Sequence, residues 1–209
     1  VTKLTQNEQE AALESARQGT LLAPFNARYH FAEANLLAAS ALPAEVLGNY
    51  AQAVKLRPLS AQYLEGAARA AGASGSAPLQ GVLLKAALQL NRADLTQYKA
   101  YAIWLLDQRR RDEALQLHRF SASLDDTDES RARHYFYNSR LQGKTKEALQ
   151  FLQDRFKRFG SRSSAPARTL AWAYDELDNA SKAFELLEKA LTLRPDDGEF
   201  QLYLADMYG

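Results

Sequence analysis

Apolar positions recur along this chain at a regular spacing. The segment Ala53–Pro58 (AVKLRP) closely resembles Ala190–Pro195 (ALTLRP), and weaker copies begin at Ala87 and Ser121. The steps from residue 53 to 87 and from 87 to 121 are both 34 residues, and one extra residue within 160–166 accounts for the later position of the last copy. A constant period of this length is typical of repeat proteins, in which each copy forms one supersecondary unit.

The residues between these copies predict helices. Ala, Leu, Gln, Glu and Arg recur throughout, while the runs of Val, Ile and Thr that are typical of strands are missing. Glycine (10) and proline (6) are scarce, and they mark turns. We expect a lone helix over 7–22, helix pairs over 27–40 with 43–57, 61–72 with 77–91, 95–107 with 111–124, 129–142 with 145–159 and 164–177 with 180–193, and a last helix from about 198.

Small residues occupy three fixed columns of the repeat. Position 8 holds Ala34, Ala68, Ala102, Phe136, Ala171 and Ala205; position 20 holds Ala12, Val46, Gln80, Ala114, Ala148 and Ala183; position 27 holds Gly19, Ala53, Ala87, Ser121, Arg155 and Ala190. Helices approach to about 8–10 Å only where small side chains face each other. The period and the columns together resemble the tetratricopeptide repeat (TPR).

This resemblance implies an all-α, right-handed α-solenoid of about five tetratricopeptide helix pairs with half-repeats at both ends. As a single domain over 1–209 it would divide into a half repeat 1–26, repeats 27–60, 61–94, 95–128, 129–163 and 164–197, and a half repeat 198–209. The 129–163 repeat departs from the pattern at Phe136, Ser139, Arg155 and Gly160, so we expect it to be distorted or to pack at an unusual angle.

Both ends of the chain fall inside repeats. We therefore expect a fragment of a longer protein, in which the last helix leaves Leu204 and Tyr208 exposed.

Composition and charge narrow the possible partners. The formal net charge of +1 gives no whole-molecule field that would select nucleic acid. The apolar run Tyr101–Leu106 is far shorter than the roughly 20 residues of a membrane span, so no membrane segment is expected. The chain has no cysteine, which excludes disulfides and thiolate metal sites but does not identify the compartment.

Candidate catalytic chemistry is sparse. His30, His118 and His134 fall on different predicted helices that are widely separated in the array, which argues against a histidine metal site or a catalytic triad. The stretch Gly72–Ser76 lacks the lysine of a phosphate-binding loop, and the acidic run Asp125–Glu129 lacks calcium-loop spacing and is suited to capping the next helix. We predict no enzyme activity, no cofactor and no metal.

In TPR arrays the first helix of each pair lines a concave groove. Carried onto this sequence, the resemblance implies groove residues Arg28, Asn35, Arg69, Lys99, Arg133, Tyr137, Arg140, Arg168 and Trp172. Those from Arg133 onward would form a basic and aromatic patch. Arginine offers a planar fork for carboxylate or phosphate, and Tyr and Trp give rigid contact area. The alternative interpretation is packing between repeats with solvated charges.

The family's carboxylate clamp for acidic peptide C-termini is not reproduced here. Phe31 stands where the clamp has a lysine beside Asn35, and Gly66 stands where it has an asparagine. Recognition of chaperone tails is therefore not expected.

We predict a scaffold that binds, in its concave groove, a partner protein through an acidic or aromatic segment, or an anionic polymer. A charged polysaccharide is one such polymer, and no binding of nucleic acid is expected. Residues 23–31 and 101–106 resemble TPR regions of bacterial envelope polysaccharide polymerases and exporters over about half the chain. That resemblance implies the periplasm, favoured over the cytoplasm, and exopolysaccharide biosynthesis. The alternative is a structural spacer or a module that self-associates through exposed ends, without a groove ligand.

Overall fold

The computed structural model describes residues 6–38, 43–92, 94–125 and 127–208, and within them it contains twelve α-helices and no strand. None of these helices is both long and apolar enough to cross a bilayer. Their bounds are α1 Gln6–Leu22, α2 Ala27–Leu37, α3 Pro43–Leu56, α4 Ala61–Ala73, α5 Ala77–Leu90, α6 Leu95–Asp107, α7 Arg111–Leu124, α8 Glu129–Leu141, α9 Thr145–Phe159, α10 Ala165–Asp175, α11 Ala180–Leu193 and α12 Gly198–Tyr208.

Every predicted helix is present and begins within one residue of its expected start. Local capping explains this agreement, because side-chain oxygens of short polar residues accept hydrogen bonds from backbone N–H groups in the first turn. The caps of α2, α4, α6 and α8 are Asn26, Ser60, Asp94 and Asp128. The predicted end of the 27–40 helix lies partly outside the described residues.

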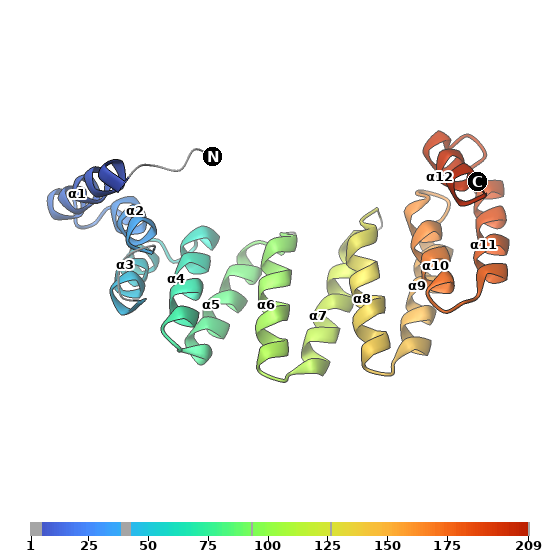
Figure 1. Cartoon of the computed structure of the whole chain (residues 1–209), viewed down its shortest axis with the longest axis horizontal. Helices are drawn as coiled ribbons and strands as arrows, with labels where there is room; N and C mark the ends of the chain where they lie inside the picture. Colours follow the sequence, from blue (N-terminus) through green and yellow to red (C-terminus); the bar gives the residue numbers. More distant parts are fainter. Residues whose placement is uncertain (1–5, 39–42, 93, 126, 209) are drawn as a thin grey trace. The chain divides into compact units, whose positions relative to one another are not determined.

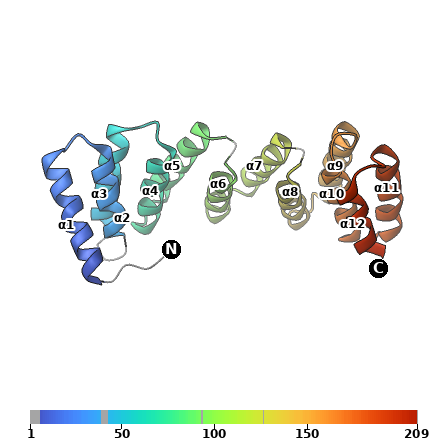
Figure 2. The same cartoon turned by 90° about the horizontal axis from the view of Figure 1, so that it is seen from above.

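The chain forms two compact units, Val1–Gln108 and Arg109–Gly209. We call them unit 1, which contains α1–α6, and unit 2, which contains α7–α12. Within each unit every helix contacts the next, α2 also contacts α4, and α8 also contacts α10. Figures 1 and 2 show that consecutive helices within a unit run in opposite directions. The boundary between the units falls in the turn of the predicted third helix pair.

Most of the small residues in these columns are buried in the helix interfaces, while Ala205 is exposed. Ala34 and Ala53 in unit 1 and Ala148 in unit 2 are fully buried. Some neighbouring glycines permit equally close packing: a Cβ built on Gly66 would lie 2.5 Å from the Tyr50 ring. Replacing these small residues with larger ones would force the helices apart, because protein interiors leave no room for added atoms.

Both helices of the 129–163 repeat, α8 and α9, are continuous, so the predicted distortion is not seen within either helix. Phe136, in the small-residue column, is 1% exposed and packs edge to face on Trp172 at 5.6 Å between ring centroids. Arg155, in another such column, is 5% exposed. Its Nη2 donates to the carbonyl oxygens of Asp125 (2.9 Å) and Asp128 (3.3 Å) in the α7–α8 connection. The large side chains therefore find partners in neighbouring elements.

The prediction that Leu204 is exposed was wrong. Leu204 is 7% exposed and belongs, with Phe200, to the hydrophobic core of unit 2. It lies on the side of α12 that packs on the preceding helices, whereas Leu202 on the other side is exposed. The side chain of Tyr208 lies outside the described residues.

Candidate functional site

Arginine and aromatic side chains from α8, α10 and α12 gather on one face of unit 2. Cζ of Arg133 on α8 lies 5.1 Å from the centroid of the Trp172 ring on α10. Cζ of Arg168 on α10 lies 5.8 Å from the centroid of the Tyr203 ring on α12. Each contact joins the first helix of one pair to the first helix of the next. We call Glu129, Arg133, Arg168, Trp172 and Tyr203 the first-helix face.

Glu129 holds both arginines of this face. Its Oε2 accepts from Nη2 of Arg133 at 2.9 Å, and its Oε1 pairs with Nη2 of Arg168 at 2.7 Å. The carboxylate lies in the first turn of α8, where the helix dipole favours a negative charge. The Nε atoms of both arginines are buried without a hydrogen-bond partner. The two guanidinium groups are thus fixed in place by one shared anion.

The aromatic side chains of this face are also held firmly. Trp172 packs on the buried ring of Phe136, and the Arg133 guanidinium also lies over its ring. Burial raises the pKa of the Tyr203 hydroxyl above its usual value of 10.0, so the group stays a neutral hydrogen-bonding hydroxyl. Rigid aromatic surface of this kind binds partners at a low cost in conformational entropy.

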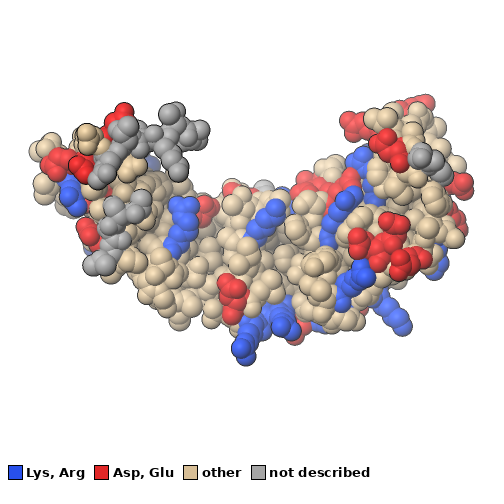
Figure 3. All heavy atoms as spheres, viewed as in Figure 1, with Lys and Arg blue, Asp and Glu red and all other residues tan. Residues whose placement is uncertain are grey.

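The other predicted patch residues lie beside this cluster. Arg140 Nη1 pairs with Glu176 Oε2 at 3.0 Å, and Tyr137 is 54% exposed. Figure 3 shows acidic side chains over α10 with basic side chains next to them. Each arginine of the predicted patch is therefore paired with a carboxylate, and the surface has mixed charge where the sequence predicted a basic and aromatic patch.

The predicted groove residues of unit 1 are placed on α2, α4 and α6. Asn35 accepts a hydrogen bond from the hydroxyl of the buried Tyr50 at 2.7 Å, so its side-chain oxygen serves packing within the unit. Arg28, Arg69 and Lys99 are exposed. Of the nine predicted residues, the contacts described above bring three together: Arg133, Arg168 and Trp172.

Two members of the first-helix face were not predicted. Glu129 stands four residues before Arg133, a spacing that favours an ion pair along a helix, so charge patterning could have identified it. Tyr203 lies outside the groove positions that the family pattern gives for its helix, and no feature of the sequence marks it. Its contact with Arg168 depends on how α12 packs.

The histidines differ from the prediction in one respect. His118 and His134 are not widely separated: their rings stack with centroids 6.4 Å apart, because α7 packs on α8. Burial, and then the charge of His134, lowers the pKa of His118 from 6.5 to about 4. No group of three metal-ligating side chains is found in the part of the chain that the structure describes.

Comparisons with known proteins identify the type of fold. No family model matches the sequence, and no curated protein matches it. Among solved structures, YrrB, described as a TPR protein with an unusual peptide-binding site, is 19% identical with a TM-score of 0.53, over 93% of this chain and 100% of that chain. PilF of Pseudomonas aeruginosa is 17% identical with a TM-score of 0.56, over 96% and 91%.

The protein MamA is similar as well, with 13% identity and a TM-score of 0.57 over 75% of this chain and 86% of that chain. Identities this low carry information about the fold alone. The all-α architecture of stacked helix pairs predicted from the sequence is confirmed, and the chain has a fold of the tetratricopeptide repeat type.

Proposed function

We propose that this protein is an interaction scaffold that binds an extended protein segment on the first-helix face of unit 2. The observation that carries the proposal is the pair of contacts between Arg133 and Trp172 and between Arg168 and Tyr203, on three successive first helices. The fold supports it, since YrrB, which has the same type of fold, is described as having a peptide-binding site.

The chemistry of the face favours a particular kind of segment. Arginine, tryptophan and tyrosine concentrate binding energy in interfaces. Two guanidinium groups and one carboxylate leave a single positive charge, so a polyanion gains little, while one carboxylate of a partner can share the arginines with Glu129. An aromatic side chain of the partner would stack on Trp172 or Tyr203. We therefore expect a segment that combines aromatic and acidic residues.

The face is built for binding and not for catalysis in this proposal. Both carboxylate oxygens of Glu129 are engaged by guanidinium groups, so this side chain positions the two arginines. The finer hypothesis of a role in exopolysaccharide assembly rests on the sequence resemblance of residues 23–31 and 101–106. A charged polysaccharide is therefore the alternative ligand.

The test is a calorimetric titration with three defined probes. They are a synthetic peptide of alternating aspartate and phenylalanine, the same peptide with lysine in place of aspartate, and polygalacturonate as an acidic polysaccharide. The variant Arg133→Gln/Arg168→Gln/Trp172→Leu should bind the acidic peptide at least about tenfold more weakly, a loss of about 1.4 kcal/mol or more. The matched control is Lys182→Gln/Lys189→Gln on α11, which should bind as the parent does.

The outcomes separate the candidates. Unchanged affinity of the triple variant for the acidic peptide, with an unchanged circular dichroism spectrum, would contradict the proposal. Polygalacturonate binding that exceeds peptide binding and needs the same three residues would favour the polysaccharide. A concentration-dependent dimer that binds none of the probes would favour the self-association alternative.

A further inference from the structure

Three turns of this chain are built alike. They span residues 23–26, 57–60 and 194–197, and each has proline in second place. In each, the backbone N–H of the fourth residue donates to the carbonyl of the first, at 2.9, 3.3 and 3.3 Å. The fourth residues, Asn26, Ser60 and Asp197, also accept a backbone hydrogen bond from the helix that follows. The turns differ at the third residue, which is Phe25, Leu59 or Asp196.

The apolar residues in these turns do not contribute to the core. Phe25 is 86% exposed and Leu59 is 82% exposed. Because Asp196 occupies the same place in the same turn, the turn itself does not require an apolar residue there. Leu59 lies between α3 and α4, with further helices of unit 1 before and after it, so its exposure does not arise from an end of the chain. Exposed apolar groups that adjoin one another are typical of an interaction surface.

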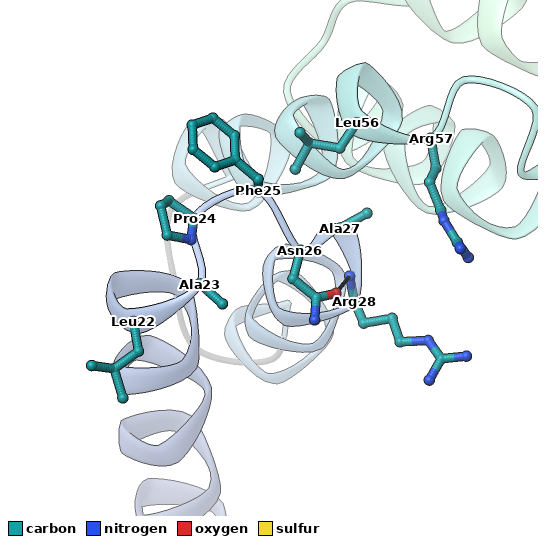
Figure 4. A pocket seen from close by; sticks show the side chains of 9 residues that line it. All are labelled: Leu22, Ala23, Pro24, Phe25, Asn26, Ala27, Arg28, Leu56 and Arg57. Atoms are coloured by element: carbon teal, nitrogen blue, oxygen red, sulfur yellow. Dashed lines mark hydrogen bonds between the residues drawn. The ribbon is translucent and has the colours of Figure 1, made fainter.

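Two hollows surround these side chains. The first, of about 640 Å³, is lined by Leu22, Phe25 and Leu56 together with Arg28 and Arg57. The second, of about 520 Å³, surrounds Leu59 and shares Leu56 and Arg57 with the first. Figure 4 shows Phe25 and Leu56 on one side of the first hollow and the two arginines on the other. We call these six residues, Leu22, Phe25, Arg28, Leu56, Arg57 and Leu59, the proline-turn surface.

The arginines of this surface differ from those of the first-helix face. In the part of the chain that the structure describes, the guanidinium groups of Arg28 and Arg57 have no ion pair or hydrogen bond, whereas Arg133 and Arg168 share Glu129. Unpaired guanidinium groups beside apolar side chains are complementary to an anion attached to an apolar group.

We propose that the proline-turn surface is a second docking site, which takes a partner peptide carrying a bulky apolar side chain next to a carboxylate. The apolar side chain would lie against Phe25 and Leu56, and the carboxylate would pair with Arg28 and Arg57. A peptide is favoured over a lipid bilayer because Leu22 points away from Phe25 (Figure 4), while insertion into a bilayer needs the apolar side chains on a common side. This site lies in unit 1 and is independent of the proposed function of unit 2.

The probe is a hexapeptide with two central leucines flanked by pairs of aspartates, and its match has lysines in place of the aspartates. Binding is followed by calorimetry and by NMR shifts of residues 22–28 and 56–60. Phe25→Asp/Leu59→Asp copies the residue of the third turn, and Phe25→Ser/Leu59→Ser removes the apolar contact without adding charge. Both variants should bind the acidic peptide at least about tenfold more weakly than the parent does. Neither should have a lower melting temperature, because these side chains are exposed.

The arginine pair is tested separately. The variant Arg28→Gln/Arg57→Gln should bind the acidic peptide about tenfold more weakly than the parent does. Its binding should also lose most of its salt dependence, since exposed charge pairs are screened by salt. The Arg133, Arg168 and Trp172 triple variant should bind this peptide as the parent does. A variant that loses binding of one peptide and keeps binding of the other therefore distinguishes a failure of this site from a failure of the first-helix face.

Three results would overturn the proposal. The first is acidic-peptide affinity that the serine pair and the glutamine pair both leave unchanged. The second is binding to phosphatidylserine vesicles that the serine pair abolishes, without peptide binding, which would assign the surface to a membrane. The third is a dimer of the parent chain that the serine pair dissociates, without peptide binding, which would assign the surface to a second copy.

Discussion

Oε1 of Glu129 on α8 lies 2.7 Å from Nη2 of Arg168 on α10, and the same carboxylate holds Arg133. Glu129→Gln keeps the shape of the side chain but removes its charge. We expect the free energy of unfolding to fall by about 1–2 kcal/mol, because hydrogen bonds to charged groups contribute more than neutral ones. Urea unfolding measures this change. Glu188→Gln, exposed on α11, should stay within about 0.5 kcal/mol of the parent.

The same substitution also frees two guanidinium groups on the first-helix face. The acidic aromatic peptide should therefore bind Glu129→Gln more tightly than the parent at low salt, and the difference should shrink as salt is added. Equal affinity at low salt would show that the arginines do not contact the peptide.

Two helical glycines should respond to alanine in opposite ways. A Cβ on Gly81 of α5 would overlap the ring of Trp104, and the indole N–H of Trp104 donates to the carbonyl of Ala77 at 3.0 Å, which resists movement of the ring. Gly81→Ala should cost about 1–2 kcal/mol of unfolding free energy, because overpacking exceeds the gain in helix propensity. Gly48 of α3 has open space around it, so Gly48→Ala should add about 0.5–1 kcal/mol. Chemical denaturation of the two variants side by side checks both signs.

Arg155 should be essential for the α7–α8 connection. Arg155→Ala removes a buried side chain and leaves the carbonyl groups of Asp125 and Asp128 without their donor. We expect a loss of about 2–4 kcal/mol in urea unfolding. The exposed Lys189→Ala on α11 serves as the control and should change stability by less than about 0.5 kcal/mol. A loss for Arg155→Ala no larger than that of the control would show that the two hydrogen bonds do not support the fold.

Acid should destabilise the protein through His118 as the pH falls from 6.5 toward 4. The pKa of His118 is about 4 in the folded protein and 6.5 in the unfolded chain. Between these pH values the unfolded state therefore binds a proton at His118 that the folded state does not bind. Stability due to the neutral ring is complete above pH 6.5 and is lost as the pH falls toward 4. The slope should be below about 1.4 kcal/mol per pH unit, because the ring is partly exposed and solvent screens it.

The measurement is urea unfolding at pH 7, 6 and 5 for the parent and for His118→Gln. The stability difference between the two proteins should shift in favour of the variant as the pH falls. His30→Gln is the control, because His30 instead contacts the carbonyl of Pro24. A stability difference between parent and His118→Gln that is the same at all three pH values would refute the assignment.

The fold and the candidate site were predictable to different degrees. Three residues at the groove positions of the repeat, Arg133, Arg168 and Trp172, lie in one cluster in the structure, and their role in binding stays a prediction. The sequence did not indicate that these arginines are already paired, and it missed Tyr203 entirely. A residue's partners in such a fold lie on helices one or more repeats away, so they depend on how those helices pack.

By itself, the sequence determined where the helices begin and which residues form the turns between them. Caps such as Asn26 and Asp128 act within a single turn, and the 34-residue step repeats the same short-range instructions. Only the tertiary structure decided that Leu204 is buried while Phe25 is exposed, and that His118 meets His134. These outcomes depend on contacts between elements, which no local stretch of sequence encodes.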